Sequence, residues 1–242
     1  MSERAPEPPR ERRFQKVIRR ILDAATRTIV AGGVDALSMN RLAATLDYTP
    51  GALYRYFPSK DALVATLLIE VIEEVGSDVA RAVASRADSP PLARVVACAR
   101  AWRRFADADP HRFALLAMML ASPRLVLASE DHTKHAIGAL LAATRPLAVA
   151  LAEASADGTL AATPRTEPGT DRAALVFAGL LGVLLLRKQA QRVPDLVDLD
   201  RLFAGMLRSL LAGWGATAAA LDAAFAEPEP PPAAIPFEGA SS

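Results

Sequence analysis

The sequence predicts an all-α protein, with a short N-terminal three-helix domain followed by a larger helical body. Of its 242 residues, 52% are hydrophobic but only 5% are aromatic, and a composition rich in Ala and Leu favours helices over β-branched strands. Apolar residues recur at intervals of three and four along most of the chain, and no segment shows the period-two alternation of a half-buried strand. The charge is also divided: residues 1–60 hold 11 Lys and Arg against 6 Asp and Glu, whereas the remainder holds 17 against 21. A basic N-terminal segment followed by an acidic remainder indicates that the N-terminal segment binds a polyanion.

Cysteine content and hydropathy exclude several classes of protein. The single cysteine, Cys98, rules out an intramolecular disulfide and any cysteine-cluster metal site. It lies in an apolar helical run, so we expect an inert buried thiol. The charged, Pro-rich first 22 residues do not resemble a secretory signal. The longest apolar run, residues 173–186, is shorter than the roughly 20 residues that span a bilayer. We therefore expect a cytoplasmic protein that does not associate with membranes.

Composition divides the chain into four parts. Residues 1–12 and 227–242 are rich in proline and charge, which predicts a disordered N-terminal arm and a disordered tail. Between them we expect a domain over 13–60 and a second over 61–226. Residues 154–170, rich in Gly, Pro, Thr and Ser, are predicted to form a long loop.

The first helix is the most clearly amphipathic. Its apolar stripe consists of Phe14, Val17, Ile18, Ile21, Leu22, Ala25 and Ile29, at intervals of three and four. The cations around it, Arg12, Arg13, Lys16, Arg19, Arg20 and Arg27, mostly fall on other faces and should be exposed. Gly32 and Gly33 supply the left-handed conformation that ends a helix.

Two short helices follow, separated by a tight turn. Ser38 is a candidate N-cap for the first, and Asp47 with Tyr48 forms the turn. Thr49 is the N-cap of the second, which we expect over 50–57 with Pro50 at its first position. So short a helix is unstable alone, so Leu53 and Phe57 must anchor it. Two short helices supported by a longer one form the helix-turn-helix pattern.

The surface that this second helix leaves exposed suits DNA. Small residues at 49–52 let the backbone approach a groove, and Tyr54, Arg55 and Tyr56 carry donors for phosphate oxygens and base edges. Ser59 caps the next helix with Lys60 in its first turn, which suits one phosphate. The alternative is that both tyrosines are core aromatics, but residues two apart on a helix cannot share a face. The candidate DNA-contacting residues are Ser38, Asn40, Arg41, Thr49, Pro50, Gly51, Ala52, Tyr54, Arg55, Tyr56 and Lys60.

Residues 14–68 resemble the N-terminal DNA-binding domain of TetR-family transcriptional regulators, above all in GALYRYFPSKDAL at 51–63. The resemblance implies that the second short helix enters the major groove, and that Tyr54, Tyr56 and Lys60 position the DNA backbone. The chain departs from the family pattern in the turn, where Asp47 stands in place of the usual glycine and must adopt a left-handed conformation at some cost. Tyr48 and Pro50 also differ from the usual small apolar and polar residues, so base preference cannot be transferred.

Beyond these elements the sequence predicts helices over 60–86, 91–107, 111–121, 131–153, 171–192 and 197–225. Pro146 should kink the fourth of them or start a new segment. The last should break near Gly213 and Gly215.

The resemblance implies dimerisation through the last two main helices, here 171–192 and 197–213. The run 173–186 is apolar nearly all round, and such a helix needs burial on every side. The alternative is the central core helix of a monomer. The candidate dimer residues are Leu175, Ala178, Gly179, Gly182, Leu186, Leu202 and Met206.

Residues 92–120 carry aromatic and aliphatic side chains at helical spacing, either as plain core or as the lining of a ligand pocket. For a pocket, the candidates are Trp102, Phe105, His111, Phe113 and Met119. Such a lining favours a largely apolar small molecule.

Enzymatic chemistry has little support in the sequence. No phosphate-binding glycine loop and no Ser, His and acid triad with a recognisable spacing is present. His132 and His135 could share a metal, but acidic residues beside them at a helix start suit the helix dipole. We expect no enzyme, no metal and no cofactor.

The predicted function is a ligand-responsive repressor, whose homodimer binds a palindromic double-stranded DNA operator and releases it when a small molecule binds. Two alternatives remain open. One is a helical ligand-binding or protein-interaction module without DNA binding, and the other is a cofactor-free enzyme that uses a helical cavity.

Overall fold

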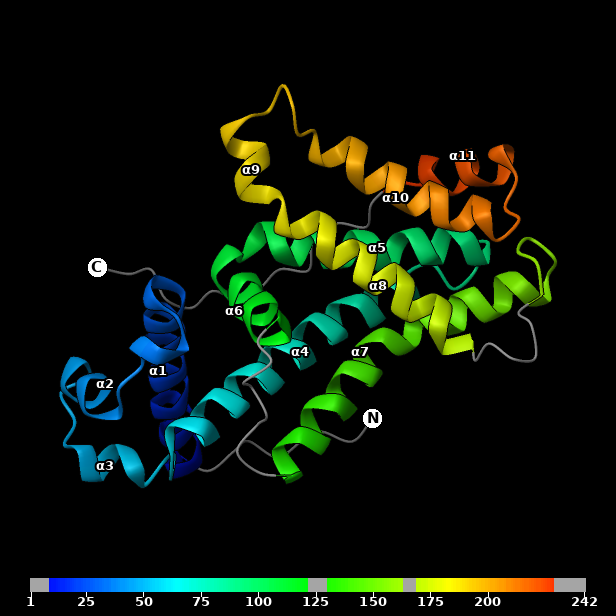
Figure 1. Cartoon of the computed structure of the whole chain (residues 1–242). Helices are drawn as coiled ribbons and strands as arrows, with labels where there is room; N and C mark the ends of the chain where they lie inside the picture. The colour runs from blue at the N-terminus through cyan, green and yellow to red at the C-terminus, as the bar shows by residue number, and fades with distance from the viewer. Residues whose placement is uncertain (1–8, 122–129, 163–168, 229–242) are drawn as a thin grey trace. The chain divides into compact units, whose positions relative to one another are not determined.

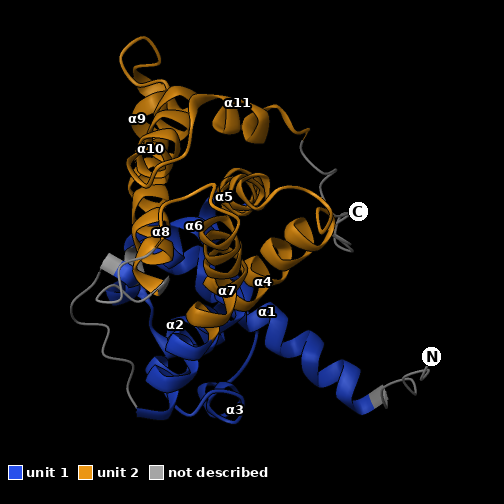
Figure 2. Ribbon diagram, turned by 90° about the vertical axis from the view of Figure 1, so that its right-hand side faces the viewer, with its two compact units in different colours: residues 1–72, 109–138 blue, residues 73–108, 139–242 orange. Residues whose placement is uncertain are grey.

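The computed structural model describes residues 9–121, 130–162 and 169–228 (Figure 1). These residues form helices without a strand, which confirms the predicted all-α class. The elements are α1 (Pro9–Gly32), η1 (Val34–Ala36), α2 (Met39–Thr45), α3 (Pro50–Tyr54), α4 (Lys60–Ala84), α5 (Pro91–Ala108), α6 (Pro110–Ala121), α7 (Glu130–Ala156), α8 (Gly169–Leu185), α9 (Arg187–Arg192), α10 (Leu199–Gly213) and α11 (Ala218–Ala226). They belong to two compact units: residues 1–72 with 109–138, and residues 73–108 with 139–242 (Figure 2).

The first unit is built around α1, whose apolar stripe contacts α2 and α6. Ile21, Ala25 and Ile29 are fully buried. The helix begins at Pro9, so the predicted disorder of 1–12 is wrong for residues 9–12, while residues 1–8 lie outside the described residues. Residues 9–12 lack an apolar face, but an exposed extension of an anchored helix needs none, because proline suits its first position and Arg and Glu are good helix formers.

The end of α1 follows the prediction. Gly33 has φ +80°, and its N–H donates to the carbonyl of Ile29 at 2.7 Å. The short 3-10 turn η1 after it was not predicted.

The turn between α2 and α3 relies on Asp47. Its φ of +60° places it in the left-handed region, as the missing glycine required. The Asp47 N–H donates to the Ala44 carbonyl at 3.2 Å, and the Tyr48 N–H donates to the Ala43 carbonyl at 2.9 Å. This pair of bonds is a Schellman motif, with aspartate where glycine is usual.

Asp47→Gly is therefore expected to raise the free energy of unfolding by about 0.5–1 kcal/mol, because glycine removes the left-handed strain at a smaller cost in chain entropy. Asp47→Ala is expected to lower it by about 1 kcal/mol, since alanine lacks the short polar side chain that eases this conformation. Urea unfolding followed by circular dichroism measures both. Any order of stability other than Gly, then Asp, then Ala would contradict this account of the turn.

The second unit has α5 at its centre, with α8 and α11 packed against it and α10 packed against α8. The Trp102 and Phe177 rings meet edge to face with centroids 4.9 Å apart. At Cys98, burial raises the pKa of the thiol to about 12. The thiol therefore stays protonated at neutral pH, as expected of an inert buried cysteine.

Three helix boundaries refine the predictions. α7 runs through Pro146 as one helix, so no new segment starts there. The expected helix over 171–192 is two helices, because the chain turns at Leu186 between α8 and α9. The predicted break near Gly213 and Gly215 is present, and Gly215 has φ +103°.

By length and composition alone, α7 and the stretch 170–192 are long and apolar enough to cross a bilayer. Core helices of helical bundles pass the same test. α8, which makes up most of the second stretch, packs against α5 and α10.

Candidate nucleic-acid interface

Local capping holds α3 in place. The Thr49 hydroxyl accepts a hydrogen bond from the Ala52 N–H at 3.2 Å, and Pro50 occupies the first helical position, both as predicted. Leu53 and Phe57 are buried and anchor the helix in the first unit. The regular helix ends at Tyr54 rather than at 57. The N–H groups of Tyr56 and Phe57 continue the winding by donating to the Leu53 carbonyl at 3.0 and 3.1 Å.

The outer face of α3 is exposed and small. Thr49, Pro50 and Gly51 are all exposed, and a Cβ added at Gly51 would meet no atom of the chain within 4 Å. Packing within the chain therefore does not require glycine at this position. The space in front of Gly51 is free of atoms of this chain, so another molecule can approach the backbone there.

Tyr54 and Tyr56 differ in exposure, as their spacing of two residues predicted. Tyr54 is 46% exposed and Arg55 is exposed, so Tyr54 is not a core aromatic. Tyr56 is half-buried, and its ring lies 5.3 Å from the ring of Phe14 on α1. The side chains of Tyr54 and Arg55, at the end of α3, are thus exposed outside the core.

α2 contributes exposed polar residues beside α3, with which it is in contact. Asn40 and Arg41 are exposed, and Ser38 is half-buried. The predicted hydroxyl cap at Ser38 is wrong, because its side chain makes no cap hydrogen bond. The Ser38 carbonyl still accepts from the Leu42 N–H at 2.8 Å, and the remaining N–H groups of an exposed first turn can bond to water instead.

The start of α4 provides a second capped helix terminus in the same unit. The Ser59 hydroxyl accepts from the Ala62 N–H at 3.0 Å, which confirms the predicted cap. Lys60 is the first residue of α4 and is half-buried. A lysine beside the unpaired N–H groups of a first turn suits one phosphate group.

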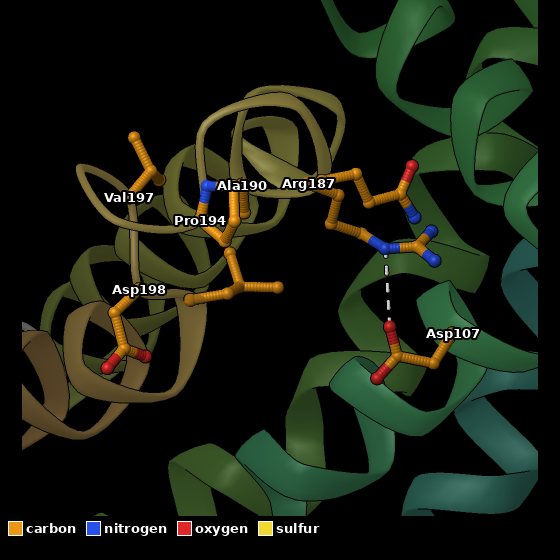
Figure 3. A pocket seen from close by; sticks show the side chains of 8 residues that line it. Asp107, Arg187, Ala190, Pro194, Val197 and Asp198 are labelled. Atoms are coloured by element: carbon orange, nitrogen blue, oxygen red, sulfur yellow. Dashed lines mark ion pairs between the residues drawn. The ribbon is translucent and has the colours of Figure 1, made fainter.

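The candidate ligand residues do not line one described cavity. Trp102, Phe105 and Phe113 are buried, and His111 is exposed at the start of α6. The side chain of Met119 lies outside the described residues. An open pocket of about 340 Å³ lies elsewhere in the second unit, between the end of α5 and the 187–199 segment (Figure 3). Arg187 and Asp107 both line this pocket, and the Arg187 Nε lies 3.2 Å from the Asp107 Oδ1 in an ion pair.

The candidate dimer residues differ in their exposure. Leu175, Ala178 and Gly182 are exposed along α8 at helical spacing, with Leu175 at 54% exposure, and Leu186 is exposed at the turn after α8. Gly179 instead packs within the chain, because a Cβ there would lie 2.8 Å from the sulfur of Met206 on α10. Leu202 is half-buried on α10. Sequence reasoning missed Leu185, which is 50% exposed beside Leu186.

The described residues contain no group of three or more His, Cys, Asp or Glu side chains placed to hold a metal. The ring Nδ1 of His135 lies 3.0 Å from the Asp131 carbonyl oxygen in its own helix. A hydrogen bond within one turn accounts for this contact.

Comparison with known proteins identifies the family. Residues 21–67 match the model of bacterial regulatory proteins of the tetR family, and residues 95–210 match the tetracyclin repressor-like C-terminal domain. The chain belongs to the TetR family. Both the predicted resemblance and the predicted fold class are confirmed.

Individual relatives are more distant. The HTH-type transcriptional regulator Rv1816 of Mycobacterium tuberculosis is 30% identical over 102 residues, which cover 42% of this chain and 44% of that protein. The HTH-type transcriptional repressor KstR of Mycolicibacterium smegmatis is 40% identical over 81 residues, which cover 34% and 37%. The chain thus spans less than half the length of these curated relatives.

Solved structures match over more of the TetR-family chain. SCO4313, a candidate regulatory protein, is 27% identical with a TM-score of 0.66, covering 85% of this chain and 100% of its own. A tetR-family regulatory protein from Rhodococcus RHA1 is 17% identical with a TM-score of 0.67, covering 84% and 98%, and shows the same fold.

Proposed function

We propose that this TetR-family protein is a DNA-binding transcriptional repressor in which α3 enters the major groove of an operator. One observation carries the proposal: α3 is capped and anchored from inside, yet its outer face is exposed and open at Gly51. A helix in that position brings its first turn close to base edges, while flanking side chains contact phosphates.

The side chains divide between two tasks. Tyr54, Tyr56 and Lys60 are proposed to position the DNA backbone, with Ser38, Asn40 and Arg41 from α2 adding contacts. Thr49, Pro50, Gly51, Ala52 and Arg55 are proposed to face the base edges. A loss of backbone contacts should weaken binding to every sequence, whereas a change in base contacts should alter sequence preference.

Tyr54→Ala and Lys60→Ala are therefore expected to weaken binding to operator and unrelated DNA alike, by roughly 3- to 30-fold each. Thr49→Ala and Arg55→Ala are expected to change the ranking of operator variants. Gel-shift titrations against a fragment selected from the source genome measure both effects. Wild-type affinity for both Tyr54→Ala and Lys60→Ala would contradict the proposed docking.

We propose a homodimer formed through α8 and α10. The exposed apolar and small residues Leu175, Ala178, Gly182 and Leu185 make a stripe at helical spacing on α8, and Leu186 is exposed at the turn that follows. A second copy would cover this stripe and would supply the burial that so apolar a helix needs. Two copies on a two-fold axis would present two α3 helices to a palindromic operator. A regulator of chromosomal DNA is expected in the cytoplasm.

We also propose that a largely apolar small molecule controls DNA binding, as an effector with a different affinity for the bound and released conformations. SmeT has been solved with triclosan, and FadR of Bacillus subtilis with stearoyl-CoA, and both resemble this fold. Trp102, Phe105, His111, Phe113 and Met119 remain the residues proposed for contact with an effector. The family is one of regulators, which supports a protein without enzymatic activity.

A further inference from the structure

The first half of α1 carries a row of cations that the proposed DNA interface does not use. Arg13, Lys16 and Arg20 follow one another at intervals of three and four residues, so they lie on one side of the helix. All three are exposed. None of them pairs with an acidic residue in the ranges that the structure describes. We call these three residues the basic stripe.

One cation in the first half of α1, Arg19, already pairs with an acidic residue of the chain. Arg19 lies on another side of α1, where its Nη1 donates to the Glu70 carboxylate of α4 at 2.8 Å. That charge is balanced inside the first unit. The basic stripe remains as the uncompensated charge, in a segment, residues 9–20, that holds six Arg and Lys but only one acidic residue.

The turn of α1 that carries Arg13 packs against the segment that follows α3. Phe14, next to Arg13 in sequence, has its ring 5.3 Å from that of Tyr56, which follows α3. Figures 1 and 2 both show the first turns of α1 and the helix α3 toward the lower end of the first unit, and Figure 2 shows those first turns of α1 extending to one side of α3. Lys60, at the start of α4, is the cation already assigned to the DNA backbone.

We infer that Arg13, Lys16 and Arg20 form a second phosphate-contact surface for the duplex that α3 enters. Duplex DNA carries about one negative charge per 1.7 Å of its axis, and each neutralised phosphate releases counterions. Exposed arginine and lysine side chains that have no acidic partner among the described residues fit that polyanion. Because they contact phosphates rather than bases, they add affinity without sequence preference. This inference rests on the proposed function.

The test is a salt titration of DNA binding by the full-length protein. The variant R13Q/K16Q/R20Q is compared with wild type on the genome-selected operator and on random duplex of equal length, by fluorescence anisotropy. Arg27→Gln is the matched control, because Arg27 is also exposed and follows Arg20 by seven residues on the same side of α1. It lies roughly 20 Å along the helix from Phe14, given a rise of about 1.5 Å per residue.

The slope of log K against log salt is expected to become shallower by at least about 2 in the triple variant, since each lost phosphate contact removes about 0.9 and each subunit carries the stripe. The loss of affinity should be equal on operator and random duplex, and Arg27→Gln should keep the wild-type slope. Circular dichroism melting confirms that the variants are folded.

Two outcomes would overturn the inference. A wild-type slope in the folded triple variant, with Tyr54→Ala still weakening binding, would show that α1 does not contact phosphates while the proposed function stands. A loss confined to the operator would show that these side chains read bases instead. Failure of the wild-type protein to bind any duplex would refute the proposed function itself, together with the inference.

Discussion

Gly51→Glu is expected to weaken operator binding by at least about 100-fold while the fold remains intact. A side chain at this position meets no atom of the chain within 4 Å, so the monomer accommodates it. An acidic residue in the first turn of a helix is even favourable for the helix dipole. In the complex, however, the same side chain would occupy the space through which the backbone approaches the groove. It would also bring a carboxylate close to phosphates. A loss of 100-fold corresponds to about 2.7 kcal/mol of binding free energy.

Gly138→Glu is the matched control for this prediction. Gly138 is also an exposed helical glycine with nothing within 4 Å of an added Cβ, but it belongs to α7. Both variants add one negative charge, so net charge alone affects them equally. Fluorescence anisotropy with the selected operator should find Gly138→Glu within about threefold of wild type. Equal affinity of Gly51→Glu and Gly138→Glu would show that α3 does not approach DNA closely.

Leu175→Asp is expected to dissociate the dimer, with at least a 100-fold rise in the dimer dissociation constant and a matching loss of operator affinity. Leu175 is 54% exposed on the apolar stripe of α8, which a two-fold interface would bury. In such an interface the same surface of both copies meets, so one substitution introduces two charges. Each buried charge without a partner costs several kcal/mol. Sedimentation equilibrium at micromolar concentration measures the change.

Leu141→Asp serves as the comparison for dimerisation. Leu141 is 61% exposed, but on α7 rather than on the α8 stripe. This variant is expected to sediment as wild type and to bind the operator normally. The proposed interface would be wrong if Leu175→Asp also remained a dimer, or if the wild-type protein were a monomer.

Local rules predicted the elements around α3 because those elements depend on nearby residues. The caps at Thr49 and Ser59, the proline at the first position and the buried Leu53–Phe57 pair all follow from the sequence within one turn. The left-handed Asp47 also followed, because the turn requires positive φ whichever residue occupies it. The exposure of Tyr54 needed only the geometry of a helix.

Features set by distant contacts could not be predicted in this way. The turn at Leu186 has neither glycine nor proline at it, and no local signal marks it. After the turn, Arg187 reaches back to α5, where it contacts the Asp107 carboxylate at 3.2 Å and the Ala106 carbonyl. Those partners lie some 80 residues earlier in the chain, beyond any periodicity argument.

The candidate effector residues show the same limit. An apolar stripe on a helix has the same pattern whether it lines a ligand cavity or fills the core. Trp102, for example, packs edge to face on Phe177, a contact that belongs to the core of the second unit.

The central claim is that α3 lies in the major groove at two sites of one operator. Dimethyl sulfate protection tests it most directly, because guanine N7 lies in the major groove and adenine N3 in the minor groove. On a selected fragment with guanine in both half-sites, we predict protection of guanine N7 in two patches, separated by about 10 base pairs or a multiple of that spacing. A stable complex that protects only adenine N3, or that leaves every guanine N7 reactive, would contradict the claim.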